Sequence, residues 1–180
     1  MIVGLTGYAQ SGKDSTAAAL GFTRVAFADA LKEVVLEMDP WVASSVGMHR
    51  PLSDFVEMHG WEWTKQNTDA RDYLIALGDG ARRHISPTVW IDAVKQKINH
   101  LVDNGRDVAI TDVRYANEAE LIIHMGGEIW LVQREEAGPA NSTESDSIDR
   151  LLLRPGANRV ISNDGTLDDL RAKIDSLMTR

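Results

Sequence analysis

The sequence has no cysteine, fewer basic than acidic residues and no long apolar run, and each lack excludes a class of protein. Without cysteine the chain can form neither disulfides nor thiolate metal sites, which suits a reducing compartment. The 27 acidic and 19 basic residues give a net charge of −8, which argues against a protein that grips the backbone of a nucleic-acid polymer. No apolar run approaches membrane-spanning length, and an apolar strand predicted from residue 2 leaves no room for a signal peptide. We therefore expect a cytoplasmic protein with neither a nucleic-acid polymer nor a membrane as partner.

The order of apolar and amphipathic segments predicts an α/β fold. We expect the 180 residues to form one domain, 1–180, in which buried strands alternate with helices. Strands are expected at 2–6, 24–28, 108–111, 129–132 and 160–162, and helices from 14 and at 29–38, 69–84, 91–101, 117–125 and 167–177. The helix at 69–84 should be broken or loosened around Gly78 and Gly80, and residues 39–68 should be irregular or form short helices. This pattern predicts a three-layer α/β/α domain with a mainly parallel central sheet and a ligand at the carboxyl ends of its strands.

A glycine-rich segment, GYAQSGKDS, follows the first predicted strand. Gly7, Gly12 and Lys13 fit the phosphate-binding pattern G-x-x-x-x-G-K. Glycines let successive N–H groups point at a phosphate, the following helix adds the positive end of its dipole, and the lysine can follow the β- and γ-phosphates. The alternative is a glycine-rich turn that binds nothing. The strand before the loop and the lysine at its end favour a P-loop NTPase fold.

The other polar residues of this segment suggest how ATP and its metal are held. Gln10 and Ser11 lie inside the loop, and Ser15 follows it, where its hydroxyl can bind the α- or β-phosphate region. Asp14 stands where the pattern has Ser or Thr. We expect the Asp14 carboxylate to contact Mg²⁺ through water, with capping of the helix as the alternative.

Charged residues follow two further predicted strands. Asp29 comes after the second strand with Lys32 one turn later, and it either caps the helix or binds a ligand. Asp112 and Arg114 follow a buried strand. The aspartate can hold Mg²⁺ directly or through water, and the arginine can pair with a phosphate through two hydrogen bonds. A local Asp–Arg ion pair is the alternative reading.

A polar segment at 134–156 follows the fourth long strand and is either a functional lid or a surface excursion. Arg134 opens it and either reaches the transferring phosphoryl group or is an ordinary surface arginine. A second group of side chains suits an anion that carries an aromatic base, although solvated helix arginines are the alternative: Arg71, Arg82, Arg83 and Trp90. Arg71 and Arg82 are three helical turns apart and share a face.

Taken in order, these motifs resemble those of the bacteriophage deoxynucleoside monophosphate kinases, a group of P-loop nucleoside monophosphate kinases. The motifs span residues 4–170 and read GYAQSGKDS, FADALK, LGDGARRHISPTVW, DVRYANE, VQR and ISNDGTL. The resemblance implies transfer of the γ-phosphoryl group of ATP to a deoxynucleoside monophosphate (dNMP), with Mg²⁺, to give ADP and the diphosphate. It also implies that the aspartate after Lys13 is normal for the group. A phage-encoded enzyme would work in the cytoplasm of the host cell.

The resemblance also implies roles for individual residues. The phosphate loop would hold ATP, Asn163 and Gly165 would lie near the adenine, and Arg134 would begin a lid over about 134–156. A helical region over about 39–104 would bind the acceptor. The dNMP would be surrounded by Asp29, Lys32, Arg71, Arg83 (or Arg82), Trp90, Asp112 and Arg114. Lys13, Arg114 and Arg134 would be catalytic, and Asp14 and Asp112 would serve the metal.

Two other functions compete with this reading. A related P-loop kinase could act on another phosphorylated molecule, such as dephospho-coenzyme A or phosphomevalonate. A nucleotide-binding regulatory module could instead use its lid to signal to a partner. The arginines outside the phosphate loop count against a pure switch, which needs no second anion site. The sequence leaves open which bases are accepted, whether ribose is rejected, and whether the chain forms a homodimer.

Overall fold

A computed structural model describes residues 1–138 and 159–179, and the chain divides into two compact units. The first, called the sheet unit here, comprises residues 1–27 and those after residue 93; the second, the helical unit, comprises residues 28–93. The expectation of one kinase domain over residues 1–180, with its lid and acceptor-binding boundaries, stays a prediction. No helix in the described part of the chain is long and apolar enough to cross a membrane.

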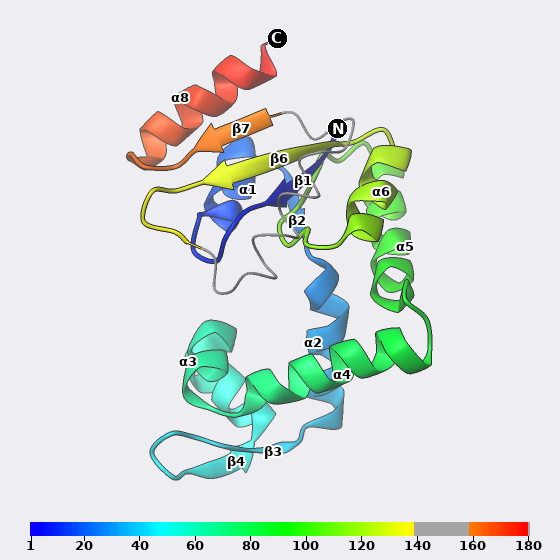
Figure 1. Cartoon of the computed structure of the whole chain (residues 1–180), viewed down its shortest axis with the longest axis vertical. Helices are drawn as coiled ribbons and strands as arrows, with labels where there is room; N and C mark the ends of the chain where they lie inside the picture. Colours follow the sequence, from blue (N-terminus) through cyan, green and yellow to red (C-terminus); the bar gives the residue numbers. More distant parts are fainter. Residues whose placement is uncertain (139–158, 180) are drawn as a thin grey trace. The chain divides into compact units, whose positions relative to one another are not determined.

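The sheet unit is built on five parallel strands in the order β2-β5-β1-β6-β7 (Figure 1). The strands are β1 (Ile2–Thr6), β2 (Thr23–Val25), β5 (Val108–Ile110), β6 (Glu128–Gln133) and β7 (Arg159–Ser162). The prediction of an α/β fold with a mainly parallel sheet is therefore confirmed. Because all five strands run the same way, the segments that follow them emerge at one edge of the sheet.

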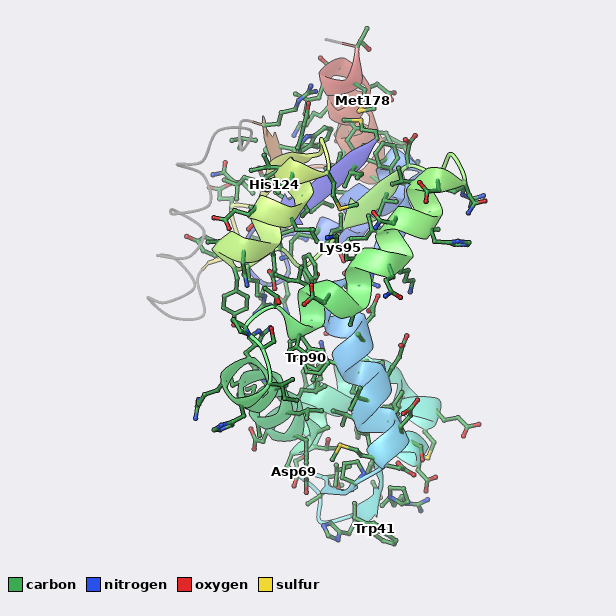
Figure 2. All side chains as sticks on the ribbon, turned by 90° about the vertical axis from the view of Figure 1, so that its right-hand side faces the viewer. Trp41, Asp69, Trp90, Lys95, His124 and Met178 are labelled. Atoms are coloured by element: carbon green, nitrogen blue, oxygen red, sulfur yellow. The ribbon has the colours of Figure 1, made fainter. Side chains whose placement is uncertain are left out.

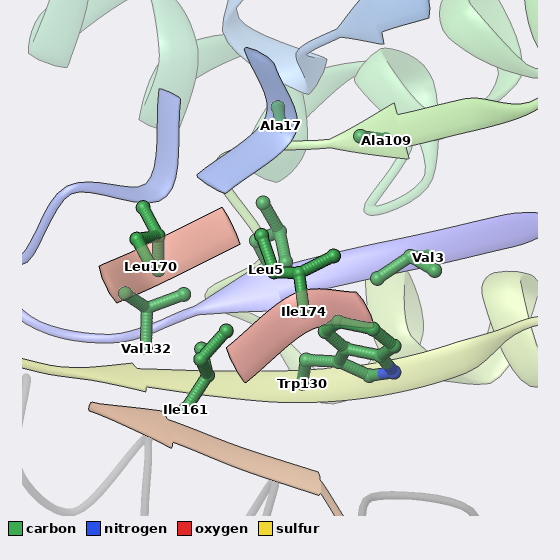
Figure 3. Close-up of a cluster of buried hydrophobic side chains, with 9 residues drawn as sticks. All are labelled: Val3, Leu5, Ala17, Ala109, Trp130, Val132, Ile161, Leu170 and Ile174. Atoms are coloured by element: carbon green, nitrogen blue, oxygen red, sulfur yellow. The ribbon is translucent and has the colours of Figure 1, made fainter. Parts of the chain in front are cut away.

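Helices cover both faces of this sheet. Helices α1 (Lys13–Leu20) and α8 (Leu167–Met178) lie on one face, and α6 (Ala116–His124) on the other (Figure 1). The core under α1 and α8 is drawn in Figure 3 and consists of Val3, Leu5, Ala17, Ala109, Trp130, Val132, Ile161, Leu170 and Ile174. Side chains alternate along β1, so Gly4 faces the opposite side, where an added Cβ would lie 2.6 Å from Ile122 Cδ1 of α6.

The helical unit has its own core and a small antiparallel hairpin; its side chains, Trp41, Asp69 and Trp90 among them, are drawn in Figure 2. Its elements are α2 (Phe27–Met38), β3 (Trp41–Ala43), β4 (His49–Pro51), α3 (Leu52–Asn67), α4 (Ala70–His84) and the start of α5 (Val89–Asp103). The core is formed by Val35, Val42, Leu52, Phe55 and Ala70. Asp69 joins α4 to the hairpin, since its Oδ1 accepts the N–H of Ala43 at 2.9 Å.

The sequence expectation for residues 39–68 was correct for short helices but missed a β-hairpin. They form the β3–β4 hairpin and α3, a 16-residue helix interrupted at Gly60, whose φ of 76 and ψ of 166 are not helical. This break divides the helix into two short amphipathic pieces. Each piece therefore contains too few repeats of the 3.6-residue apolar period for one continuous helix to be recognised from the sequence.

Two smaller expectations were also wrong. Strand β2 ends at Val25, and α2 begins at Phe27, because the Asp112 carboxylate accepts the N–H of Phe27 at 2.9 Å and so satisfies the first turn of the helix. Helix α4 runs through Gly78 without loosening. An added Cβ there would lie 3.3 Å from Leu31 Cδ2 of α2, so this glycine allows α4 to pack closely against α2.

Candidate active site

The loop between β1 and α1, residues 7–12, has the backbone of an anion-binding nest. Gly7, Gln10 and Gly12 have φ values of 142, 63 and 95. A Cβ at Gly12 would lie 2.0 Å from Asn163 Nδ2, and one at Gly7 would lie 2.3 Å from the carbonyl oxygen of Val132. Both glycines are thus required by backbone conformation and by close packing. Helix α1 starts directly after the loop and adds the positive end of its dipole.

The ammonium group of Lys13 lies over this loop. Its Nζ donates to the carbonyl oxygens of Gly7 and Tyr8, each at 2.8 Å, and the side chain is half-buried. A full positive charge, a nest of N–H groups and a helix N-terminus therefore coincide at residues 7–13, an arrangement that favours a bound polyphosphate.

Asp14 lies in the first turn of α1 and pairs with an arginine from β2. Arg24 Nε donates to Asp14 Oδ1 at 2.8 Å. Desolvation works to raise the pKa of Asp14, but the hydrogen bond and charge of Arg24, helped by the Thr111 hydroxyl and Lys13, hold that pKa below its usual 3.8. The Asp14 side chain is 73% exposed and ionised at neutral pH, so its oxygens suit a divalent cation.

The serine and threonine hydroxyls in or next to the loop lie in three different situations. Thr6 Oγ1 and Ser11 Oγ are buried and have no hydrogen-bond partner among the described residues. Thr16 Oγ1 donates to the carbonyl of Gly12 at 3.0 Å, whereas Ser15 is exposed at the start of α1. A buried hydroxyl without a partner is costly, and Ser11 offers one inside the phosphate loop.

Asn163 follows β7 and lies against the phosphate loop. Its Nδ2 donates to the carbonyl of Ser11 at 2.9 Å, and its backbone N–H donates to the carbonyl of Gln133 at 2.7 Å. Gly165, two residues later, packs on the capping box of α8, where an added Cβ would lie 2.7 Å from Asp169 Oδ2. The structure therefore brings Asn163 to the phosphate loop and Gly165 to the start of a helix.

Asp112 and Arg114 lie next to each other after β5, and each is fixed differently. The Asp112 carboxylate accepts the N–H of Phe27, whereas the Arg114 side chain is exposed. The backbone at Arg114 is held by Glu118, whose Oε2 accepts the N–H groups of Arg114 and Tyr115 at 2.8 and 3.0 Å. Glu118 is 3% exposed. A buried carboxylate thus sets the direction of the chain from which Arg114 projects.

Arg134 directly follows β6 and is exposed. Its Nη2 lies 3.3 Å from Glu136 Oε2, an exposed ion pair that contributes little to stability. The N–H of Glu135 donates to Asp164 Oδ1 at 2.6 Å. Most of the expected lid, residues 139–158, lies outside the described residues.

The residues of the helical unit that were expected to bind the acceptor differ in exposure. Asp29 lies in the first turn of α2 rather than at its cap, and Lys32 Nζ lies 5.7 Å from the centre of the Trp61 ring. Arg71 and Arg83 are exposed on α4. Two other members of the group are engaged within the unit: Arg82 pairs with Asp79 at 3.4 Å, and buried Trp90 donates from Nε1 to the carbonyl of Gly78 at 3.1 Å.

The described residues contain no group of three or more His, Cys, Asp or Glu side chains that could hold a metal by themselves. Mg²⁺ at a nucleotide site needs only one or two carboxylates, with water and phosphate oxygens completing its shell. The exposed, ionised Asp14 beside the loop fits such a site.

Sequence reasoning missed three residues that shape this site. Arg24 acts on Asp14 from β2 and Thr111 from the residue after β5, and no sequence pattern links them to it. Glu118 could have been found, because it stands three residues after Tyr115 at a helix start, the spacing of a capping box.

Comparison with known proteins gives both a family and a fold. A family model described as deoxynucleotide monophosphate kinase matches residues 64–174, more than half of the chain. Among solved structures, a dephospho-CoA kinase from Campylobacter jejuni is 13% identical with a TM-score of 0.52, covering 99% of this chain and 95% of that one. A sugar kinase from a Janibacter species is 13% identical with a TM-score of 0.50, covering 99% and 94%. At this identity these structures show a shared P-loop kinase fold. No curated protein sequence matches the chain.

Proposed function

We propose that this chain, which belongs to the deoxynucleotide monophosphate kinase family, transfers the γ-phosphoryl group of ATP to a dNMP to give ADP and the diphosphate. The observation that carries the choice of donor is the phosphate loop with Lys13 at the start of α1. The family supports a phosphotransferase that acts on nucleotides, and the residue roles below are our assignments.

On the donor side, residues 7–15 bind the polyphosphate of ATP. The N–H groups of Gly7 to Gly12 and the exposed Ser15 contact the non-transferred phosphates, with Gln10 and Ser11 in the same loop. Lys13 exchanges its two backbone carbonyl partners for phosphate oxygens, so its charge follows the phosphoryl group in transit.

On the acceptor side, arginines bind the monophosphate and neutralise charge. Exposed Arg114 projects from a backbone fixed by Glu118 and presents a planar fork to the phosphate, with Asp112 beside it. Residues of the helical unit are also assigned to the dNMP by this proposal: Asp29, Lys32, Arg71, Arg83 and Trp90. Arg134 reaches the transferring group from the segment after β6.

The chemistry requires positioning and charge neutralisation more than a strong base. The second pKa of a phosphate monoester is about 6, so the acceptor oxygen is largely deprotonated at neutral pH. The obstacle is repulsion between two polyanions in line, which Lys13, Arg114 and Arg134 reduce. When bound, Mg²⁺ neutralises charge on the β- and γ-phosphates, and Asp14, with Asp112, would hold it directly or through water.

Its substrates suggest where the enzyme works. ATP and dNMPs are cytoplasmic metabolites, so we propose a cytoplasmic location, which is the host cytoplasm for a phage-encoded chain. A homodimer is compatible with this function but not required by it.

A panel of acceptors tests the function. The chain is incubated with ATP, Mg²⁺ and each of the common dNMPs, the corresponding ribonucleotides, dephospho-coenzyme A or phosphomevalonate, and ADP is detected with a coupled assay. We expect turnover with at least one dNMP. Turnover with only dephospho-coenzyme A or phosphomevalonate would assign a related kinase activity, and ATP binding with no turnover of any acceptor would favour a regulatory module.

A further inference from the structure

The turn after β7 contacts the phosphate loop directly. The Asn163 amide fills the space that a side chain at Gly12 would take, and its Nδ2 donates to the carbonyl of Ser11. The turn itself is fixed, because the N–H of Asn163 donates to the carbonyl of Gln133 at the end of β6. The next residue, Asp164, accepts the N–H of Glu135 at 2.6 Å. The backbone that carries the Asn163 side chain is therefore held in place at the ends of β6 and β7.

The bond to Ser11 controls the direction of a peptide group. A trans peptide is planar, so its C=O and N–H point in opposite directions. When Nδ2 holds the Ser11 carbonyl toward Asn163, the N–H of Gly12 points the other way. A flip of this peptide would turn a carbonyl oxygen toward the phosphate side of the loop and repel an anion. Gly12 has no Cβ to oppose a flip, since glycine populates positive and negative φ about equally.

We propose that Asn163 is a positioning residue that keeps the Ser11–Gly12 peptide in its anion-binding orientation, rather than a contact to adenine. This inference adds a residue role to the proposed function and rests on it only in taking ATP as the ligand of the loop. It predicts that Asn163 affects binding of the polyphosphate of any ligand, whatever base that ligand carries.

Binding of inorganic tripolyphosphate separates the two roles, because this probe carries the charge of the ATP tail without a base. Calorimetry measures the affinity of ATP and of tripolyphosphate for the wild type, Asn163→Ala and Asn163→Asp. Loss of one neutral hydrogen bond should weaken both ligands by the same factor, about three- to tenfold. Asn163→Asp should weaken both further, because a carboxylate cannot donate to the Ser11 carbonyl and adds negative charge at the loop.

The matched control is Asn104→Ala. Asn104 also donates from Nδ2 to a backbone carbonyl, that of His100 at 2.6 Å, but it lies at the end of α5 outside the candidate site. We expect it to leave both affinities unchanged. Thermal unfolding shows whether each variant is folded, and Asn163→Ser, whose hydroxyl is too short to reach Ser11, replaces Asn163→Ala if that variant does not fold.

The outcomes separate this inference from the proposed function. Equal weakening of ATP and tripolyphosphate supports the positioning role even if no acceptor is turned over, in which case only the kinase assignment fails. Weakening of ATP with unchanged tripolyphosphate affinity assigns Asn163 to the adenosine part and overturns the inference, while turnover of a dNMP keeps the function. Unchanged affinities for both ligands also overturn it. A wild type that binds neither ligand overturns both.

Discussion

The two units of the molecule hold their candidate residues in different ways. In the sheet unit, backbone groups are fixed around the site: Asn163 holds Ser11, Glu118 holds the backbone at Arg114, and Asp112 holds the start of α2. In the helical unit, Arg71 and Arg83 project from the surface of α4. The candidate residues of the sheet unit are thus organised by hydrogen bonds to the backbone, whereas the candidate arginines on α4 are long, exposed side chains.

Removal of the loop lysine should have the largest effect. Lys13→Ala should reduce kcat by at least about a hundredfold, the scale of losing a group that stabilises charge only in the transition state. The protein should still fold, because Lys13 is a half-buried residue next to the loop and does not belong to the hydrophobic core. Steady-state kinetics measures the effect, with exposed Lys97→Ala on α5 as the control. More than a tenth of wild-type kcat in Lys13→Ala would contradict the role.

Arg114 tests the second anion site. Arg114→Ala should lower kcat/KM for the dNMP about ten- to a hundredfold, the worth of a charge-assisted bidentate pair, with little change in ATP affinity. Arg114→Lys should recover only part, because an ammonium lacks the planar fork. Exposed Arg106→Ala serves as the control. Equal loss of ATP and acceptor binding would place Arg114 on the donor side or in the scaffold.

Two neighbouring arginines test whether the helical unit contributes exposed side chains to the acceptor site. Arg83 is exposed, whereas Arg82 pairs with Asp79. Arg83→Ala should raise the KM for the dNMP about tenfold, and Arg82→Ala by less, because its charge is already partly compensated. Initial-rate measurements over a range of dNMP concentrations decide between them. If Arg82→Ala raised the KM more than Arg83→Ala, the acceptor contact would belong to Arg82 instead of Arg83.

Loss of the buried carboxylate on α6 should act on stability first. Glu118→Ala leaves two N–H groups without their partner and should lower the free energy of unfolding by about 1–3 kcal/mol. Glu118→Gln, which keeps an acceptor oxygen, should cost less. Denaturant unfolding measures both, with exposed Glu120→Ala on the same helix as the control. A stability of Glu118→Ala equal to that of the control would remove Glu118 from the positioning of Arg114.

The smallest effect is expected at Asp14. Asp14→Asn should raise the Mg²⁺ concentration for half-maximal rate about three- to tenfold. Asp168→Asn is the matched control, since Asp168 lies in the first turn of α8 and pairs with Arg171 at 2.9 Å. If Asp14→Asn leaves the Mg²⁺ dependence unchanged, the carboxylate is structural.

The pH dependence of this effect follows from the lowered pKa of Asp14. Its folded-state pKa lies below 3.8, so its contribution to stability is complete above the unfolded value and disappears as the pH falls through the folded one. Between pH 5 and 8 the Mg²⁺ requirement should therefore show no titration of Asp14. Arg24→Ala should raise the pKa of Asp14 toward 3.8, which NMR titration can follow.

Much of the sheet unit could be predicted from the sequence, but the boundaries in the helical unit could not. The strand at 2–6 and the helix at 167–178 carry continuous or periodic apolar patterns, and the structure confirms both. The β3–β4 hairpin was missed, and α3 was expected only as short helices, because Gly60 interrupts its apolar pattern. Gly78 was read as a break, although its carbonyl accepts the Trp90 N–H and its missing side chain leaves room for Leu31. The sequence does not distinguish a glycine that interrupts a helix from one that allows close packing, because the difference depends on the residues around it in the folded structure.

Those parts of the site that depend on residues close together in the chain could be identified from the sequence alone. The spacing of Gly7, Gly12 and Lys13 defines the loop, because the conformations it needs depend on residues next to one another in the chain. Tertiary structure alone decided what holds that loop and tunes its charge. Asn163 is 152 residues from Ser11 and Asp112 is 85 residues from Phe27, and they meet because parallel strands deliver their following turns to one edge of the sheet. Hydrogen bonds act over about 3 Å of space whatever the separation along the chain, so no local pattern contains them.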